Sequence, residues 1–439
     1  MAATHTESFN YPVSVDPYGV KQEITFLPTQ MPKVDGFITG WSVNIVDATD
    51  GTPLPIQRLM LHHIVFQKLG VQNNACKNFT SFDSKTLLPA FAENPYGAGE
   101  ERNVMVLPPG YGYPISKNDN WSMVWMLMNH RAVTDNALIH WEVTVDDSAL
   151  LKPVIPLWFD VRNCNADPVY SVGGSGKPKV AEEKAELTMP ESGRIVAAGG
   201  HVHGGAADLV LSQPACNNRT IHTSKPAWGM PDHPFYNVRP ILHEPGPVSM
   251  SRYTSEQGFP VQKGQKIRLT SRYDNTRPHT RVMGIVPAYL APGEVSSPCE
   301  PAPTDAQDVQ PAQLAGIPFR TKTPKFKVPL TGFDANGQAI KIDRPPGKTR
   351  SLASGSTIKL GDFNFSTANI KLKKGGKLNW RVDPSTLHNI TLANGPRGFA
   401  SPNLNDGRTF TYKFKTPGTY QIFCALHPVS MTQTVTVPK

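Results

Sequence analysis

The residue types best suited to chemistry gather in the segment FCALHPVSM, residues 423–431. Cys424 is followed there by His427 and Met431, and His388 lies 36 positions before Cys424 in TLHNITL. A thiolate, two imidazoles and a weak thioether are the ligands of a type 1 copper site, because soft sulfur holds Cu(I) while imidazole suits both oxidation states. The four residues therefore predict a metal centre that exchanges electrons.

Short strands must position these ligands. The C-terminal part of the chain contains the segments ANIKLKKGGKLNWRV, HNITLAN, FTYKFKTPGTYQIFC and MTQTVTV, with turn sequences such as KKGG and TPGT. This pattern is typical of a small β-sandwich. We expect Cys424 to end one strand and His427 to lie in the turn that follows. The alternative is a buried cysteine and methionine with surface histidines.

Ligand order and strand context make this part of the chain similar to the cupredoxins, the group of plastocyanin, azurin and amicyanin. The similarity covers about residues 356–439. Asn389 directly follows the first histidine, as an asparagine does in plastocyanins. The resemblance implies a Greek-key β-sandwich whose type 1 copper is bound by His388, Cys424, His427 and Met431.

Two further histidine pairs lie in the first two thirds of the chain. LMLHHIVFQ holds His62 and His63, and GGHVHGGAADLVL holds His201 and His203. Neighbouring side chains of a regular strand face opposite sides, so the adjacent pair could share a metal only at a strand end or distortion. The alternative for that pair is a structural role. Residues i and i+2 share a face, so the H-x-H pair is a good metal chelate.

His130, at the end of MVWMLMNH, and Met283, in HTRVMGIVPAYL, complete an ordered set with these two pairs. The set resembles the copper type II, ascorbate-dependent monooxygenases, which include peptidylglycine α-hydroxylating monooxygenase and dopamine β-monooxygenase. The resemblance covers about residues 30–295. It implies two tandem jelly-roll-like sandwiches, each with one copper, that face each other across a solvent-filled cleft.

The resemblance also implies which residues bind each copper. The copper that supplies electrons would be bound by His62, His63 and His130. The catalytic copper, which activates dioxygen, would be bound by His201, His203 and Met283. Two imidazoles and a thioether favour Cu(I) and leave a position open for dioxygen. We expect the remaining histidines to be surface or satisfied side chains, with His279 as the one that could lie near a metal: His5, His140, His222, His233, His243 and His279.

Two positions depart from the peptide-processing enzyme. Gly199 stands where that enzyme has an arginine that anchors the substrate carboxylate, two residues before the H-x-H pair. Pro287 stands where it has a tyrosine, four residues after the methionine ligand, and Tyr289 follows two residues later. A peptidylglycine substrate is therefore not expected, and the substrate stays open between a small molecule and a peptide.

The cysteine count points to an oxidising compartment. If Cys424 binds metal, four of the five cysteines remain, and even numbers suit disulfides. Sequence order favours the pairs Cys76–Cys164 and Cys216–Cys299 among three possible pairings, and the alternative is free thiols in a cytosolic protein. We expect a secreted, periplasmic or cell-surface protein. The start, MAATHTESFN, has no basic and apolar signal segment, so an exported chain would already have lost its signal.

Composition divides the chain into three β-rich parts and a linker. SSPCEPAPTDAQDVQPAQLAGIPF is rich in proline, alanine and glutamine, as linkers are, and RNCNADPVYSVGGSGKPKV marks a softer boundary. No apolar run approaches 18 residues, so we expect no membrane span. The sequence predicts an all-β chain with a sandwich in residues 1–165, a second in 166–297, a linker and lead-in in 298–345, and the cupredoxin-like sandwich in 346–439.

Charge is distributed unevenly along the chain. The net charge is +9, but the part from Phe319 onward carries 19 lysines and arginines and 5 aspartates, which leaves +14 there and −5 elsewhere. Nucleic acid is not an expected partner, because the aromatic and basic motifs of its binders are missing. Opposite charges on two parts of one chain can favour docking, and the alternative is solubility alone.

Two functions from different classes fit these residues. The first is a three-copper monooxygenase that hydroxylates a substrate C–H bond with dioxygen, with electrons from an external donor (ascorbate or a redox protein) entering at the type 1 copper. The second is a non-catalytic copper-binding or electron-transfer protein that keeps the same scaffold. A nitrite reductase or laccase-like enzyme is disfavoured, because those proteins carry several cupredoxin domains and only one such motif occurs here.

Overall fold

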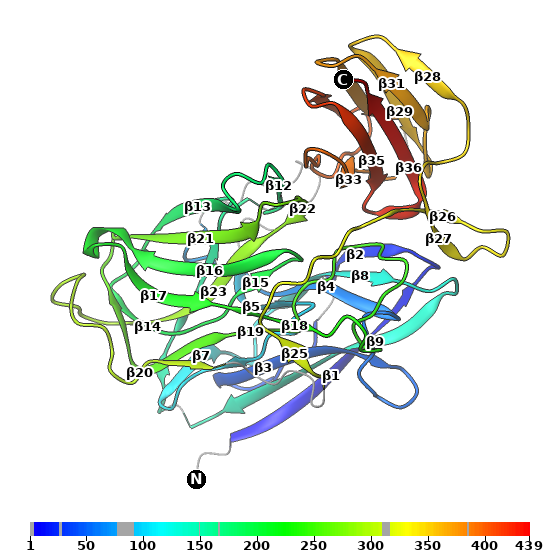
Figure 1. Cartoon of the computed structure of the whole chain (residues 1–439). Coiled ribbons are helices and arrows are strands. Elements are labelled where there is room, and N and C mark those ends of the chain that lie inside the picture. Colours follow the sequence, from blue (N-terminus) through cyan, green and yellow to red (C-terminus); the bar gives the residue numbers. More distant parts are fainter. Residues whose placement is uncertain are drawn as a thin grey trace.

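The computed structural model describes residues 4–25, 29–76, 92–148, 150–165, 167–309, 317–383 and 386–439. Strands form three β-sandwiches that follow one another along the chain (Figure 1). The predicted fold class, two tandem sandwiches followed by a third, is confirmed. No helix in the described ranges is both long and apolar enough to cross a membrane.

The first sandwich packs two sheets, antiparallel except for the short parallel pair of β7 (Tyr111–Ile115) and β10 (Lys152–Pro153), around an aromatic core. One sheet has the order β1 (Thr4–Val15), β9 (Asp135–Asp146), β3 (Gly36–Asp47), β7 and β10, with β6 (Met105–Val106) paired to β3. The other has the order β2 (Val20–Thr25), β8 (Trp121–Asn129), β4 (Leu59–Leu69) and β5 (Ala92–Gly99). Trp41, Trp125 and Trp141 are almost fully buried between the sheets, where their large apolar surfaces stabilise the fold.

The second sandwich repeats this plan. One sheet has the order β11 (Ile155–Asp160), β23 (Gly284–Pro292), β14 (Gly193–Ala198), β20 (Arg252–Val261) and β24 (Gln307–Val309), and β15 (His201–Val202) pairs with β23. The other has the order β13 (Val180–Thr188), β21 (Lys266–Asp274), β16 (Ala206–Gln213) and β17 (Arg219–Ser224), with the short 3-10 helix η1 (Pro214–Cys216) before β17. Since β11 already pairs within this sandwich, strand pairing changes domain near residue 154, before the predicted boundary at 165.

Two small sheets adjoin the second sandwich. β12 (Tyr170–Gly173) pairs with β22 (Pro278–Val282) at the end of the second sandwich. A three-stranded sheet has the order β19 (Ser249–Met250), β18 (Pro226–Gly229) and β25 (Phe319–Arg320). The described ends of the predicted linker are therefore attached to the second sandwich, through β24 and β25.

Both favoured disulfides are present. Cys76 pairs with Cys164 and Cys216 pairs with Cys299, which confirms the predicted connectivity. Cys76 follows the first sandwich's β4, whereas Cys164 follows β11 of the second sandwich, so this bond links the two sandwiches covalently. Such cross-links are typical of proteins from oxidising compartments.

Removing the interdomain disulfide is expected to destabilise the pair of sandwiches. The double variant Cys76→Ala/Cys164→Ala should lose about 2–5 kcal/mol, because the bond closes a long loop and restricts the unfolded chain. Thermal unfolding followed by tryptophan fluorescence measures the loss. An unchanged midpoint under oxidising conditions would contradict this role.

Each sheet of the third sandwich contains both parallel and antiparallel strand pairs. One sheet has the order β28 (Thr349–Leu352), β31 (Asn369–Leu372), β36 (His427–Val437), β35 (Gly418–Cys424) and β33 (Thr391–Asn394). The other has the order β30 (Asn364–Phe365), β29 (Ser356–Gly361), β32 (Lys377–Val382) and β34 (Thr409–Lys413). The pairs β31–β36 and β29–β32 are parallel, and Trp380 is fully buried between the sheets.

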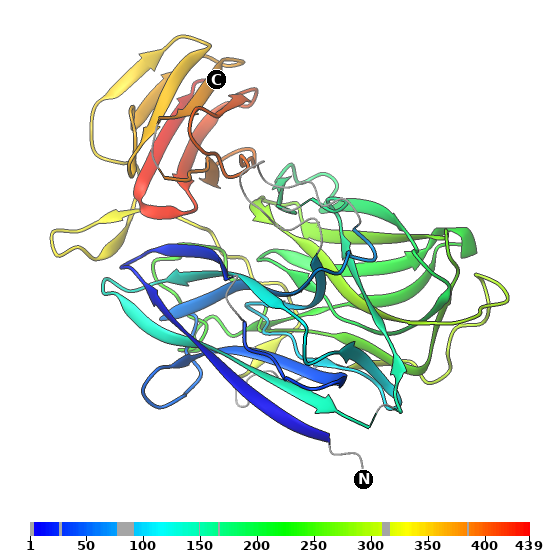
Figure 2. The same ribbon diagram turned by 180° about the vertical axis from the view of Figure 1, so that it is seen from behind.

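The third sandwich rests on the end of the other two (Figures 1 and 2). The Thr280 hydroxyl donates to the carbonyl of Leu392 at 2.9 Å, and the Arg281 guanidinium donates to the carbonyl of Ser401 at 2.9 Å. Met126 of the first sandwich belongs to the apolar cluster of the third. A hairpin of β26 (Leu330–Phe333) and β27 (Ala339–Ile342) precedes the third sandwich. Hydrogen bonds and apolar packing thus fix this domain beside β22.

Candidate metal centres

The first centre lies at the end of the third sandwich that faces the rest of the chain. His388 Nδ1 and His427 Nδ1 are 3.2 Å apart, and Cys424 Sγ lies 3.6 Å from His427 Nδ1 and 3.9 Å from His388 Nδ1. Two imidazole nitrogens on one metal, each about 2.0–2.1 Å from it, are separated by roughly 3.3 Å when the geometry is tetrahedral. The three ligand atoms therefore converge as one copper ion requires, and this set suits copper chemically.

Local pairing explains this convergence. The register between β35 and β36 shifts after Phe423, so that Cys424 pairs with His427 across a two-residue turn. His427 therefore begins β36, whereas the sequence predicted it within the turn. The backbone N–H of Asn389 donates to Cys424 Sγ at 3.3 Å, and its side-chain oxygen accepts the N–H of Ala425 at 2.8 Å. Asn389 therefore ties the segment that carries His388, just before β33, to the turn after Cys424.

Burial determines the charge of these groups before metal binds. It raises the pKa of the Cys424 thiol, although backbone N–H groups that point at the sulfur act in the opposite direction. Burial lowers the pKa of His427 to about 4, so its imidazole is neutral and has a free lone pair at neutral pH. Met431 is fully buried in the same apolar cluster as Cys424. Its role as axial ligand stays a prediction.

Replacing Asn389 with alanine is expected to loosen this site. The variant removes the acceptor of the partly buried Ala425 N–H and of the buried Thr391 hydroxyl, and an unpaired buried group costs about 1–3 kcal/mol. The midpoint of thermal loss of the copper absorption should therefore fall. Asn394→Ala is the matched control, because the Asn394 side chain bonds Gln421 at a partly exposed position away from the metal ligands. Equal midpoints for the two variants would contradict the role of Asn389.

The second candidate centre is a cavity of about 430 Å³ between the first two sandwiches. We call it the histidine cavity, after the residues that line it: His62, His63, His201, His203 and His243, with His279 and Met283 beside them. His62 Nε2 lies 3.2 Å from His243 Nε2, and His62 Nδ1 lies 3.1 Å from His63 Nδ1. The rings of His62 and His203 are 4.8 Å apart between centroids. Side chains from both sandwiches therefore meet in one place.

A strand irregularity and a short strand place these rings. The register between β4 and β8 shifts between Leu61 and His63, which is the distortion that adjacent histidines need in order to approach each other. His201 lies in β15 and His203 follows it, and their rings are 5.2 Å apart. The H-x-H pair thus lies on one face, as its spacing predicts.

Buried carboxylates orient two of the rings. Glu101 lies 3.0 Å from His201 Nδ1, and Glu244 lies 2.8 Å from His279 Nδ1. Glu100 lies farther from His243 Nδ1, at 3.7 Å. A carboxylate on Nδ1 keeps the proton there and leaves the lone pair of Nε2 for a metal, as is usual for metal-binding histidines. His201 Nε2 and His279 Nε2 are buried without a hydrogen-bond partner among the described residues.

The low polarity of the cavity keeps its imidazoles neutral. Burial lowers the pKa of His62 and His203 well below the ordinary value, with neighbouring histidines adding to the effect. Burial lowers the pKa of His63 to about 3 and that of His243 to about 4. Burial also raises the pKa of Glu100 to about 8. Neutral imidazoles with available lone pairs fit a metal site.

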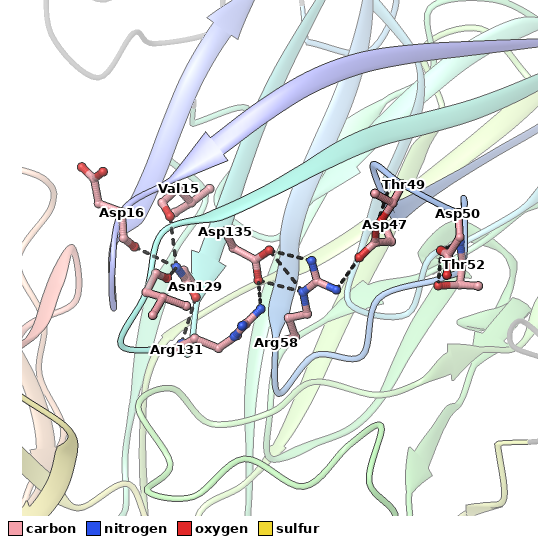
Figure 3. Close-up of polar contacts among 11 residues, drawn as sticks. Val15, Asp16, Asp47, Thr49, Asp50, Thr52, Arg58, Asn129, Arg131 and Asp135 are labelled. Carbon is pink, nitrogen blue, oxygen red and sulfur yellow. Dashed lines mark hydrogen bonds and ion pairs between the residues drawn. The ribbon is translucent and has the colours of Figure 1, made fainter.

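His130 is not among the residues that line the histidine cavity with the pair with which it was grouped. It lines a separate cavity of about 380 Å³, and both its ring nitrogens are buried without a hydrogen-bond partner among the described residues. Its backbone N–H donates to the carbonyl of Arg58. Figure 3 shows how the Arg58 guanidinium bonds Asp135 and Asp47, which ties the start of β4 to the start of β9 and the end of β3.

Sequence reasoning missed His243. The structure brings it to His62, whereas its surroundings, ILHEPGPV, show neither strand alternation nor ligand spacing. Met283, a predicted ligand, does line the histidine cavity.

The two positions that depart from the peptide-processing enzyme lie next to each other in the structure. The Gly199 N–H donates a hydrogen bond to the carbonyl of Pro287.

Comparison with known proteins identifies the third sandwich. Residues 353–438 match the family of copper binding proteins described as plastocyanin/azurin. Amicyanin-alpha of Methylorubrum extorquens is 32% identical over 106 residues, which cover 24% of this chain and 88% of that protein. The chain belongs to the plastocyanin/azurin family of copper-binding proteins. The match is confined to its C-terminal domain, a cupredoxin, so the predicted resemblance is confirmed there and copper-binding electron transfer is the function of this domain.

Further matches cover the same domain and part of the second sandwich. A purple cupredoxin from Nitrosopumilus maritimus is 30% identical, covers 19% of this chain and 98% of its own, and gives a TM-score of 0.18. An oxidised mutant of amicyanin is 20% identical, covers 19% of this chain and 81% of its own, and also gives 0.18. Residues 144–292 match the family described as stress up-regulated Nod 19. The resemblance to the ascorbate-dependent monooxygenases stays a prediction.

Proposed function

We propose that the chain is a copper-dependent oxidoreductase, a monooxygenase, in which the cupredoxin domain supplies electrons to copper in the histidine cavity. One observation carries this proposal. Phe423 and Ala425, which flank the copper ligand Cys424, line the same cavity as His62 and His203. The residues on either side of the copper ligand Cys424 therefore border the same partly open cavity as the histidine cluster, which suits electron transfer within a single chain.

The residues around the cavity have separable roles. Copper bound there would supply one-electron redox chemistry and an open position for dioxygen. Glu101 keeps the tautomer of His201, and Glu244 keeps that of His279, so that Nε2 of each ring stays available. Thr280 and Arg281 hold the cupredoxin against the cavity through hydrogen bonds to its backbone.

Finer parts of the proposal stay predictions. They are a count of three coppers, with one on His62, His63 and His130, one on His201, His203 and Met283, and one in the cupredoxin. Dioxygen, an unidentified small-molecule or peptide substrate and an external electron donor are the proposed partners. Two disulfides fit secretion or a periplasmic or cell-surface location.

A second candidate is an electron-transfer protein without hydroxylase activity. It is favoured by the residues at two positions, where Gly199 and Pro287 stand in place of the arginine and the tyrosine of the peptide-processing enzyme. Under this alternative, copper in the cavity would accept electrons but would not consume dioxygen.

Oxidation of the reduced protein by dioxygen tests the proposal. The copper-loaded chain is reduced without air and mixed with dioxygen while the returning blue absorption is followed. We expect His203→Ala to slow this return at least tenfold, whereas His140→Ala, on β9 of the first sandwich and bonded to Asn10, should match the unaltered protein. Equal rates in all three proteins would refute transfer through the cavity.

A further inference from the structure

We propose that His62, His203 and His243 form one metal site that joins the first two sandwiches and binds copper through imidazoles alone. Their ligand atoms lie within 4.8 Å of one another. This grouping takes His62 and His203 from the two separate predicted sites and adds a histidine that neither site contains. It deepens the proposed function, on which its redox role rests, by naming the ligands of copper in the cavity.

The distances match a metal site. His62 Nε2 and His243 Nε2 are 3.2 Å apart, close to the roughly 3.3 Å expected for two nitrogens on one tetrahedral metal. The ring of His203 lies 4.8 Å from that of His62 and 5.9 Å from that of His243, measured between centroids. The three rings cross at steep angles, between 70° and 86°, so they converge from different directions rather than stack.

The alternative to a metal is a chain of hydrogen bonds through the rings. Such a chain can run from His63 through His62 to His243. It leaves His203 unexplained, because both ring nitrogens of that side chain are buried with no hydrogen-bond partner among the described residues. Each unpaired buried polar group costs about 1–3 kcal/mol. A metal ion that takes one nitrogen of His203 removes part of this cost.

Three different segments supply the ligands. His62 lies in β4 of the first sandwich, His203 follows β15 of the second, and His243 lies in the connection between β18 and β19. Glu100, after β5 of the first sandwich, secures this connection, since its carboxylate accepts the N–H of Gly246 at 2.7 Å and lies 3.7 Å from His243 Nδ1. Metal binding would therefore cross-link the two sandwiches and stabilise their interface.

Three imidazole nitrogens as ligands indicate which metals the site can bind. Imidazole nitrogen suits copper and zinc, and first-row divalent ions bind such sites most tightly as Cu²⁺. Three neutral imidazoles bring no charge of their own, while Glu100 lies beside His243 and Glu101 beside His201. Copper is the occupant we propose, and zinc is the competitor that the experiment includes.

Copper binding by the full-length Cys424→Ala chain tests the site, because this background lacks the cupredoxin copper. In that background His243→Ala should bind about one copper fewer per chain and lose most of the rise in the thermal midpoint that copper produces. His222→Ala is the matched control, since His222 is a buried histidine of the second sandwich that bonds the carbonyl of Ser251. It should keep the parental copper count.

A milder variant keeps the test decisive if His243→Ala fails to fold. His243→Gln keeps a polar side chain at this position without the imidazole donor, and it should bind about one copper fewer per chain. An unchanged copper count and thermal shift in both variants would overturn the site, as would tighter binding of zinc than of copper. These readouts need no turnover. If the unaltered protein binds copper in the histidine cavity but does not react with dioxygen, the proposed function is contradicted and the metal site is not.

Discussion

Replacing Cys424 with alanine is expected to abolish the blue absorption of the copper-loaded protein and to remove one copper per chain. The thiolate is the ligand that makes a type 1 site blue and fast in electron transfer, and Cys424 Sγ lies within 3.9 Å of both imidazole ligand atoms. Visible absorption and copper analysis measure the two effects. Copper in the histidine cavity should remain, because no cavity ligand changes.

A methionine variant provides the control for this result. Met431→Leu keeps the buried volume at the predicted axial position and should retain a blue site, since the thioether is only a weak ligand. Blue absorption that survives in Cys424→Ala would contradict the assignment of the cupredoxin ligands. Loss of all copper in that variant would contradict a second copper centre.

Replacing Glu101 with alanine is expected to be the most destabilising single change near the cavity. The Glu101 side chain is fully buried, and its carboxylate accepts the N–H of Gly99 at 2.9 Å and that of the Asn103 side chain at 3.2 Å. It also lies 3.0 Å from His201 Nδ1. Breaking such a buried network leaves several groups unpaired and costs about 3–5 kcal/mol. Chemical denaturation of the disulfide-intact protein measures this loss.

Two further variants show whether the loss of stability in Glu101→Ala comes from the lost hydrogen bonds of a buried carboxylate. Glu101→Gln keeps the acceptor for Gly99 and should lose less stability than the alanine variant. Glu186→Ala breaks an exposed pair with Arg268 on the outer sheet of the second sandwich, and surface pairs contribute less than about 1 kcal/mol. If Glu101→Ala is as stable as Glu186→Ala, the carboxylate does not hold His201 in place.

Local patterns made the cupredoxin site predictable. Cys424 ends β35, His427 and Met431 lie in β36 directly after it, and strand alternation indicates the sheet that carries them. The cysteine pairs followed from chain order and the even count. The irregularity in β4 at His62 and His63 was also predictable, because adjacent side chains of a regular strand face opposite sides and could not share a metal.

The arrangement of the histidine cavity depends on long-range packing that no local pattern encodes. His62 and His243 are 181 positions apart in the chain, and they meet only because two sandwiches pack with a connecting segment between them. Glu100 and Glu101 gave no signal either, since acidic residues usually lie at the surface. The separation of His130 from His63 is likewise set by the ends of β4 and β8 rather than by spacing.

Intramolecular electron transfer tests the central claim most directly. In an air-free, copper-loaded sample, a pulse of reductant converts a small fraction of the cupredoxin copper to Cu(I), and the blue absorption is followed as it returns. We expect a first-order return whose rate is independent of protein concentration and which is lost in His62→Ala, because the electron moves to copper in the histidine cavity. A bleached signal that does not return, or a return rate proportional to protein concentration, would contradict transfer between the two centres.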